Sequence, residues 1–199
     1  MISYIHNEAL VFCQTLLSNS ICSNYQFHNL DHTKEVHKNV LLIAEEENIT
    51  SNEKEILAIS ALFHDTGYSE IYKGHEKISM QNAEEFLKNR NFDSDGISSV
   101  INCIAATRMP QEPHNILEKI ICDADFAHLA STAYLQKIAL LRKEWSYFLG
   151  INFLDEEWKT LNINFLSNHH YHTNFGMTIM EKYKLNNLQL LEETLVFEN

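Results

Sequence analysis

Apolar side chains recur along most of the chain at steps of three and four residues, the spacing that places them on one face of an α-helix. Residues 2–18 are one such segment, with apolar positions Ile2, Ile5, Ala9, Phe12, Cys13, Leu16 and Leu17. The same spacing predicts helices over 32–44, 51–65, 76–88, 97–106, 116–130, 133–149, 156–167, 174–183 and 187–195. Only five Gly and two Pro interrupt the pattern, few for a β protein. We therefore expect one all-α domain over residues 1–199, a bundle of roughly eight to ten helices.

Residues with capping and turn preferences predict where several helices begin and end. Asp31 is expected to cap the second helix. Thr50 and Glu53 have the spacing of a capping box, which opens the third. Gly67 follows that helix and is expected to end it in the left-handed conformation. Residues 107–115 hold both prolines and predict a loop.

The charge of the chain narrows the class of partner. Its formal net charge is −12, which repels the phosphate backbone of nucleic-acid polymers and leaves no basic stripe to bind one. A small phosphorylated substrate stays compatible with this charge, because a bound metal cation can invert the local field. The net charge therefore argues against a nucleic-acid polymer as the partner and leaves a small molecule as the candidate.

The four cysteines and the hydropathy pattern bear on the compartment. Cys13, Cys22, Cys103 and Cys122 show no C-x-x-C spacing, and we interpret them as free, buried thiols in a reducing compartment. The N-terminal residues lack the pattern of a secretory signal, and no apolar run is long enough to span a membrane. We expect a cytoplasmic protein without a membrane partner.

Candidate metal ligands occur on three separate helices. His64 and Asp65 end the apolar segment A-I-S-A-L-F-H-D, His32 falls on an apolar helix face, and Asp125 follows the apolar run I-I-C-D-A. A lone core histidine is more often hydrogen-bonded than ligated, but several buried imidazoles and carboxylates offset one another best around a cation. Two His with two Asp form a mixed nitrogen and oxygen set that suits Zn, Mn, Fe, Co or Mg.

The order F-H-N-L-D-H-T, L-F-H-D-T-G-Y and I-C-D-A-D-F-A-H-L over about residues 25–130 resembles the HD superfamily of metal-dependent phosphohydrolases. The resemblance implies an all-helical HD-type bundle with a central metal site, followed by C-terminal helices over 131–199. It also implies that His32, His64, Asp65 and Asp125 are the metal ligands. Asp123 is the other acidic residue near that position, and we place it outside the ligand set as a supporting group.

Two finer features refine the resemblance. F-H-N-x-x-H-T is similar to the Y-H-N-x-x-H segment of the cyclic-nucleotide phosphodiesterase branch, in which the first His protonates the leaving oxygen; that role would fall on His28, with Phe27 in place of Tyr. K-G-H-E-K-I-S resembles the H-E-x-x-S found after the metal pair in many members. His75 and Glu76 could then reach a second cation or its water, with Asp65 bridging.

Other polar residues are weaker candidates. Lys73 and Arg108 could contact a phosphate, although surface charges are usually only solvated. The run N-H-H-Y-H-T contains His169, His170 and His172, and such a tract can bind metal. Helical phase sends these three side chains to different faces, and a helix end is an ordinary place for histidine, so the pattern favours an ordinary helix end.

The sequence predicts hydrolysis of a small phosphoester, either a nucleotide monoester or a cyclic-nucleotide-like diester, by metal-activated water. One or two divalent ions would be the cofactor, and Asp65 would orient the nucleophile. Two alternatives stay open. Some members of the superfamily are oxygenases with a di-iron centre, and a non-catalytic sensor could keep both fold and metal. The sequence leaves the metal, the exact substrate and the oligomeric state undetermined.

Overall fold

The computed structural model describes residues 4–196, which contain α- and 3₁₀-helices, one π-helical turn and no strand. The α-helices are α1 (Tyr4–Ser18), α2 (Leu30–Glu46), α3 (Ser51–Phe63), α4 (His75–Lys88), α5 (Ser94–Ala106), α6 (Ile116–Asp125), α7 (Tyr134–Leu149), α8 (Asp155–Asn168) and α9 (Glu181–Val196). Short 3₁₀ segments are η1 (Ile21–Asn24), η2 (Thr66–Ser69) and η3 (Phe126–Ala130), and η4 (Gly176–Met180) is the π-helical turn. The chain is therefore an all-α bundle, as predicted. Ile2 lies outside the described residues.

Helix α3 is the centre of the bundle. Every residue from Leu57 to Phe63 is buried, and a helix that is apolar on all sides is stable only inside a core. One face of α3 packs with α2, α5 and α6, and the other packs with α1, α4 and α5. The end of α3 therefore delivers whatever follows Phe63 into the interior.

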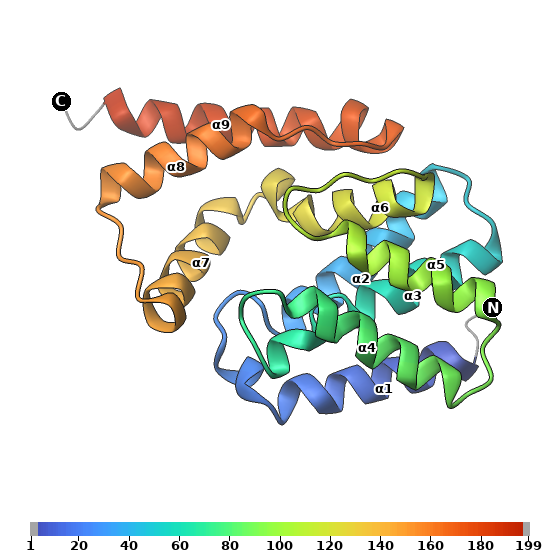
Figure 1. The fold of residues 1–199 in the computed structure, drawn as a ribbon. Helices are drawn as coiled ribbons and strands as arrows, with labels where there is room; N and C mark the ends of the chain where they lie inside the picture. Colours follow the sequence, from blue (N-terminus) through green and yellow to red (C-terminus); the bar gives the residue numbers. More distant parts are fainter. Residues whose placement is uncertain (1–3, 197–199) are drawn as a thin grey trace.

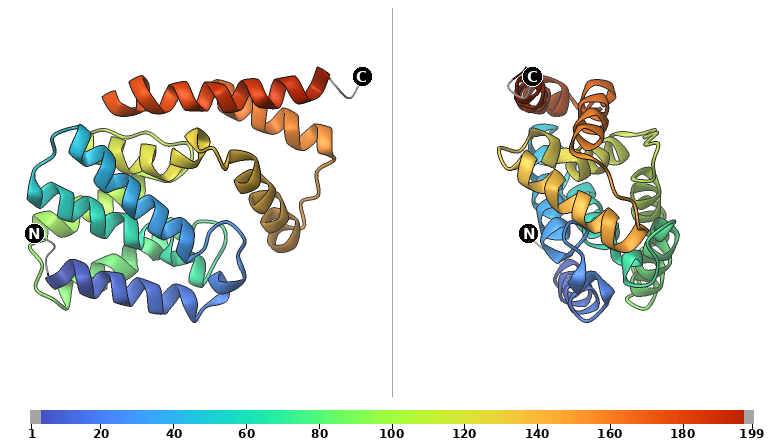
Figure 2. Two further views of the ribbon diagram at one scale, coloured as in Figure 1. Left: turned by 180° about the vertical axis from the view of Figure 1, so that it is seen from behind. Right: turned by 90° about the vertical axis from the view of Figure 1, so that its left-hand side faces the viewer.

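The C-terminal helices form a second layer on this core. In Figure 1, α7 stands beside the first six helices, and α8 and α9 lie against each other above them. Seen from behind, α9 and α1 occupy opposite edges of the molecule (Figure 2). Two charged side chains of α7 reach α2: Lys137 pairs with Glu35, and Glu144 contacts His28 in the lead-in to α2. These contacts fix α7 over the start of α2.

Several helix ends differ from the expectation. Asn29, and not Asp31, caps α2, because its side chain accepts hydrogen bonds from the backbone N–H groups of Asp31 and His32. The expected helices 174–183 and 187–195 are one element, in which the π-helical turn η4 continues directly into α9. The capping box of Thr50 and Glu53 is present as predicted.

Gly67 is needed for a different reason from the one its sequence position suggested. The glycines with positive φ among the described residues are Gly74 and Gly150, and Gly67 does not take the left-handed conformation. A Cβ at Gly67 would lie 2.0 Å from the carbonyl oxygen of His75 and 2.9 Å from the backbone nitrogen of Ser79. Glycine at this position lets η2 pack directly on the start of α4.

No helix within residues 4–196 is long and apolar enough to cross a membrane.

Candidate metal centre

His64 and Asp65 leave the end of α3 in the middle of the core. His64 follows the last residue of α3 in helical conformation, and its Nδ1 donates a hydrogen bond to the carbonyl oxygen of Ala61 at 2.8 Å. Because a carbonyl can only accept, this bond fixes the tautomer and leaves a lone pair on Nε2. His64 and Asp65 are 1% and 5% exposed, so neither can rely on bulk water.

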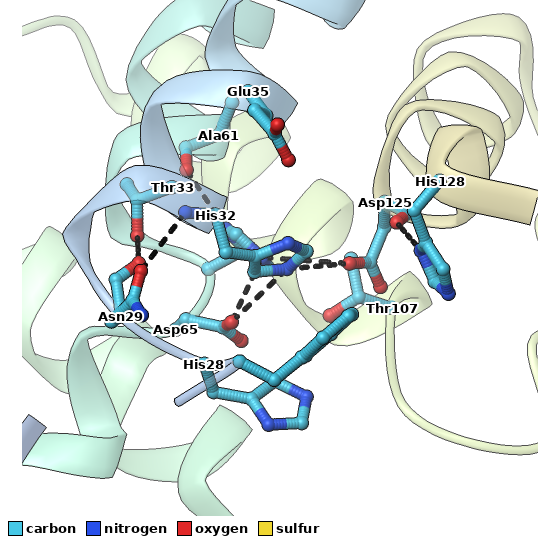
Figure 3. Close-up of polar contacts among 12 residues, drawn as sticks. His28, Asn29, His32, Thr33, Glu35, Ala61, Asp65, Thr107, Asp125 and His128 are labelled. Carbon is cyan, nitrogen blue, oxygen red and sulfur yellow. Dashed lines mark hydrogen bonds and ion pairs between the residues drawn. The ribbon is translucent and has the colours of Figure 1, made fainter. Parts of the chain in front are cut away.

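Two further side chains meet this pair. His32 lies in the first turn of α2, where the cap formed by Asn29 sets the direction of the helix, and Asp125 is the last residue of α6. Figure 3 shows His32 between the carboxylates of Asp65 and Asp125. Its Nε2 lies 3.4 Å from Oδ2 of Asp65 and 3.2 Å from Oδ1 of Asp125. Three helices that are separate in sequence therefore converge on one point.

The spacing of these atoms fits a shared cation. His64 Nε2 lies 3.2 Å from Oδ2 of Asp65 and 3.7 Å from Oδ1 of Asp125. Ligand atoms about 2.1 Å from one ion are about 3.4 Å apart in a tetrahedral arrangement and about 3.0 Å apart in an octahedral one. His32, His64 and Asp125 form a group that could hold a metal ion, with ligand atoms all within 4.8 Å of one another.

Three buried atoms at this point lack a hydrogen-bond partner within the described residues: His32 Nε2, His64 Nε2 and Asp65 Oδ2. Leaving a buried polar atom unpaired costs about 1–3 kcal/mol, and more for a charged group. His64 Nε2 faces carboxylate oxygens at 3.2 and 3.7 Å, and a positive group between these atoms would serve as a partner for all of them. The donor set therefore fits a divalent cation.

The electrostatics of the carboxylates and imidazoles agree with this requirement. Burial acts to raise the pKa of Asp65, but the imidazoles of His64 and His75 outweigh it and hold the pKa well below the usual value. Burial acts to lower the pKa of His64, yet Asp65 and Asp125 raise it well above normal. The pocket therefore stabilises positive charge strongly enough to overcome the penalty of burial.

His75 offers a second set of contacts to Asp65. Its Nε2 lies 3.2 Å from Oδ1 of Asp65, the oxygen that does not face His32 and His64, and its Nδ1 lies 3.9 Å from Glu76. The two oxygens of Asp65 thus point to two different groups of side chains. This is the arrangement that a bridging carboxylate requires.

His28 lies beside this centre and is held by a carboxylate from α7. Its Nδ1 is 2.5 Å from Oε1 of Glu144, whose other oxygen accepts the backbone N–H groups of Phe27 and His28 at 2.7 and 3.0 Å. Tyr72 also donates to Glu144 at 2.7 Å. Burial acts to lower the pKa of His28, but Glu144 with Asp65 and Asp125 outweighs it, so the pKa is raised.

Sequence reasoning missed Glu144 and His128. Glu144 is fully buried, on the face of α7 that also carries Leu141 and Phe148; a carboxylate on an apolar stripe was the available signal. The Nδ1 of His128 donates to the backbone carbonyl of Asp125 at 3.2 Å. Burial, and then the proximity of His32, lowers the pKa of His128 to about 3, so this imidazole is neutral beside the centre.

Asp123 does not join the centre, contrary to the expectation of a supporting role there. Its carboxylate accepts the backbone N–H groups of His172 and Thr173 at 2.8 and 2.9 Å and the hydroxyl of Thr173 at 2.7 Å. Asp123 points to the opposite side of α6 from Asp125 because α6 turns by about 100° per residue. It ties the segment before η4 to the core.

The remaining candidates are two surface cations and the histidine run. Lys73 and Arg108 are both exposed. The histidine run follows α8. His170 is exposed, and the half-buried ring of His169 packs against Phe126 and Tyr171. None of the three is among the residues that the structure groups as a possible metal site.

Known proteins resemble this chain both in sequence pattern and in fold. A family model described as HD domain matches residues 29–129, just over half of the chain. The predicted HD superfamily hydrolase of an uncultured Thermotogales bacterium has a similar fold, with a TM-score of 0.66 and 16% identity over 97% of this chain and 92% of that one. The Lin1889 protein of Listeria innocua is also similar, with a TM-score of 0.63 and 18% identity over 96% and 97% of the two chains. A search of curated protein sequences finds no significant match.

Proposed function

The chain belongs to the HD domain family, and we propose that it is a metal-dependent phosphohydrolase that cleaves a small phosphoester. The observation that carries this proposal is the convergence of three buried, unpaired atoms, His32 Nε2, His64 Nε2 and Asp65 Oδ2, beside Asp125. The similar solved structure is described as a predicted HD superfamily hydrolase, which supports the same class of reaction. The substrate would be a nucleotide or a cyclic-nucleotide-like ester, and the net charge of −12 argues against a nucleic-acid polymer.

Four side chains would hold the cation: His32 and His64 through Nε2, Asp65 through Oδ2 and Asp125 through Oδ1. A divalent cation in such a site lowers the pKa of a water that it binds from about 16 towards about 7 and polarises a phosphoryl oxygen. Asp65 would orient the attacking water. The hydrogen bond from His64 to Ala61 fixes one donor atom in the direction of the site.

His28 would act as the general acid. Because Nδ1 is engaged by Glu144, Nε2 is the atom that would deliver a proton to the departing oxygen. Glu144 raises the pKa of His28, which keeps more of the imidazole protonated at neutral pH. A carboxylate behind the imidazole also holds the ring in one orientation, which a positioned acid requires.

Elemental analysis of the purified protein, followed by assays on phosphomonoesters, phosphodiesters and cyclic nucleotides with added Mn, Mg, Zn and Co, tests this function. We expect bound metal and turnover of at least one ester. Asp65→Ala should lose metal and activity together. Full turnover by that variant at unchanged metal content contradicts the role of Asp65 as a ligand. Bound metal without turnover of any ester would favour a sensor.

A second candidate is a di-iron oxygenase. His75 Nε2 contacts the second oxygen of Asp65. This contact favours the oxygenase, because a pair of bridged ions would need both oxygens of Asp65 and a further histidine. One ion would use Oδ2 of Asp65 and the other Oδ1. Iron as the main bound metal, together with substrate-dependent oxygen consumption, would separate this activity from hydrolysis.

A further inference from the structure

Tyr68 lies between the two histidines that flank the proposed centre. It belongs to η2, three residues after Asp65, and is 6% exposed. Its ring stacks on His75 with centroids 3.7 Å apart and planes 17° apart, and it tilts against His28 at 4.7 Å and 30°. The aromatic ring is therefore fixed on both sides by imidazoles that the proposed function already uses.

The two imidazoles that hold the ring of Tyr68 each contact a carboxylate: His75 Nε2 lies 3.2 Å from Oδ1 of Asp65, and His28 Nδ1 lies 2.5 Å from Oε1 of Glu144. Burial raises the pKa of Tyr68 well above its usual value, and the negative charges of Asp65, Glu144 and Asp125 raise it further. A tyrosine hydroxyl carries a proton that it can donate in a hydrogen bond.

This donor has no acceptor within residues 4–196. Three other buried or half-buried tyrosines do: Tyr72 donates to Glu144 at 2.7 Å, Tyr134 to Asn162 at 3.1 Å and Tyr171 to the carbonyl of Phe126 at 3.2 Å. The hydroxyl is not among the fully buried unpaired atoms, so a water or a ligand can reach it and supply the acceptor. The neighbouring carboxylates are already directed at imidazoles.

We propose that the hydroxyl of Tyr68 donates a hydrogen bond to a phosphoryl oxygen of the substrate, beside the proton that His28 delivers to the leaving group. This inference rests on the proposed function and names a substrate-binding residue for it. The ligand class follows from the surroundings. The hydroxyl of Tyr68 is a hydrogen-bond donor between His28 and His75, in a site that contains several carboxylates. The acceptor that suits it is an anionic oxygen of a ligand that the cation binds.

Tyr68→Phe tests the proposal because it removes one oxygen and keeps the stacked ring. Calorimetric titration of the metal-containing protein with inorganic phosphate should show affinity about tenfold weaker in this variant, the loss expected for a hydrogen bond to a charged acceptor. Metal content should match that of the wild type. The melting temperature should be unchanged or higher, since the hydroxyl has no partner in the free protein. Tyr134→Phe is the matched control, and its phosphate affinity should equal that of the wild type.

Three results would overturn the proposal: equal phosphate affinity in Tyr68→Phe and the wild type, no phosphate binding by the wild type, or unfolding of Tyr68→Phe, which would mean that the hydroxyl supports the fold. Failure of the proposed function has a different signature. In that case phosphate still binds more weakly to Tyr68→Phe than to the wild type, while none of the esters is hydrolysed.

Discussion

The Nδ1 atom of His28 lies 2.5 Å from Oε1 of Glu144, a residue 116 positions further along the chain. His28 precedes α2 and Glu144 lies in α7, so this contact joins the motif-bearing core to the C-terminal helices. The other oxygen of Glu144 accepts two backbone N–H groups at the same turn. One buried carboxylate thus holds the proposed acid in position and raises its pKa.

Glu144→Gln should change the pH dependence of activity. Removing the negative charge lowers the pKa of His28, because Glu144 is the strongest influence that raises it. The imidazolium is the active form of an acid, so activity is lost as pH rises through that pKa. We expect the alkaline limb of kcat/KM to move down by about one pH unit or more. Metal content should not change. A pH profile that coincides with that of the wild type would show that Glu144 does not determine the pKa of the general acid.

His28→Ala should leave the metal in place and slow the chemical step by about 10²–10⁴-fold for substrates with poor leaving groups. The loss should be much smaller for nitrophenyl esters, whose leaving oxygen needs no proton. The measurement is the dependence of kcat on leaving-group pKa in the variant and the wild type. An equal loss for all leaving groups would sink the assignment of His28 as acid.

Asp125→Asn and Asp123→Asn form a matched pair on α6. Asp125 faces His32 and His64, whereas Asp123 bonds to residues 172 and 173. Asp125→Asn should lower metal content and activity together. Asp123→Asn should keep the metal but lower the free energy of unfolding by about 1–3 kcal/mol, since charged hydrogen bonds are weakened. Elemental analysis and denaturant melts check both. Metal loss in Asp123→Asn alone would reverse the assignment.

The helices were predictable where their apolar spacing was strong, because burial of one face determines the helix whatever its neighbours are. The exact ends were not. Asp31 and Asn29 are both capping residues two positions apart, and only the backbone conformation at Asn29 decides between them. The junction between η4 and α9 was missed because a π-helical turn shifts the periodicity without ending the helix.

The convergence of His32, His64, Asp65 and Asp125 followed from polar residues on apolar faces together with the family resemblance; their role as ligands stays a prediction. Glu144 could not be paired with His28 from sequence, since a contact over 116 positions depends on how α7 packs. Asp123 and Asp125 were separable in part, by their helical phase. Long-range partners and backbone contacts, such as Gly67 against His75, require the fold itself.

Gly67→Ala is the sharpest test of how the fold supports the site. The added methyl would meet the backbone of His75 and Ser79, at 2.0 and 2.9 Å from the carbonyl oxygen and the nitrogen. Backbone atoms cannot rotate away, so α4 must shift, at about 1–3 kcal/mol of stability. His75 moves with it, and activity should fall by more than the unfolded fraction explains. Gly150→Ala is the control: its φ is +66° with nothing within 4 Å, so it should lower stability through backbone strain alone and keep activity per folded molecule. Equal specific activity in both variants would show that the position of His75 does not affect catalysis.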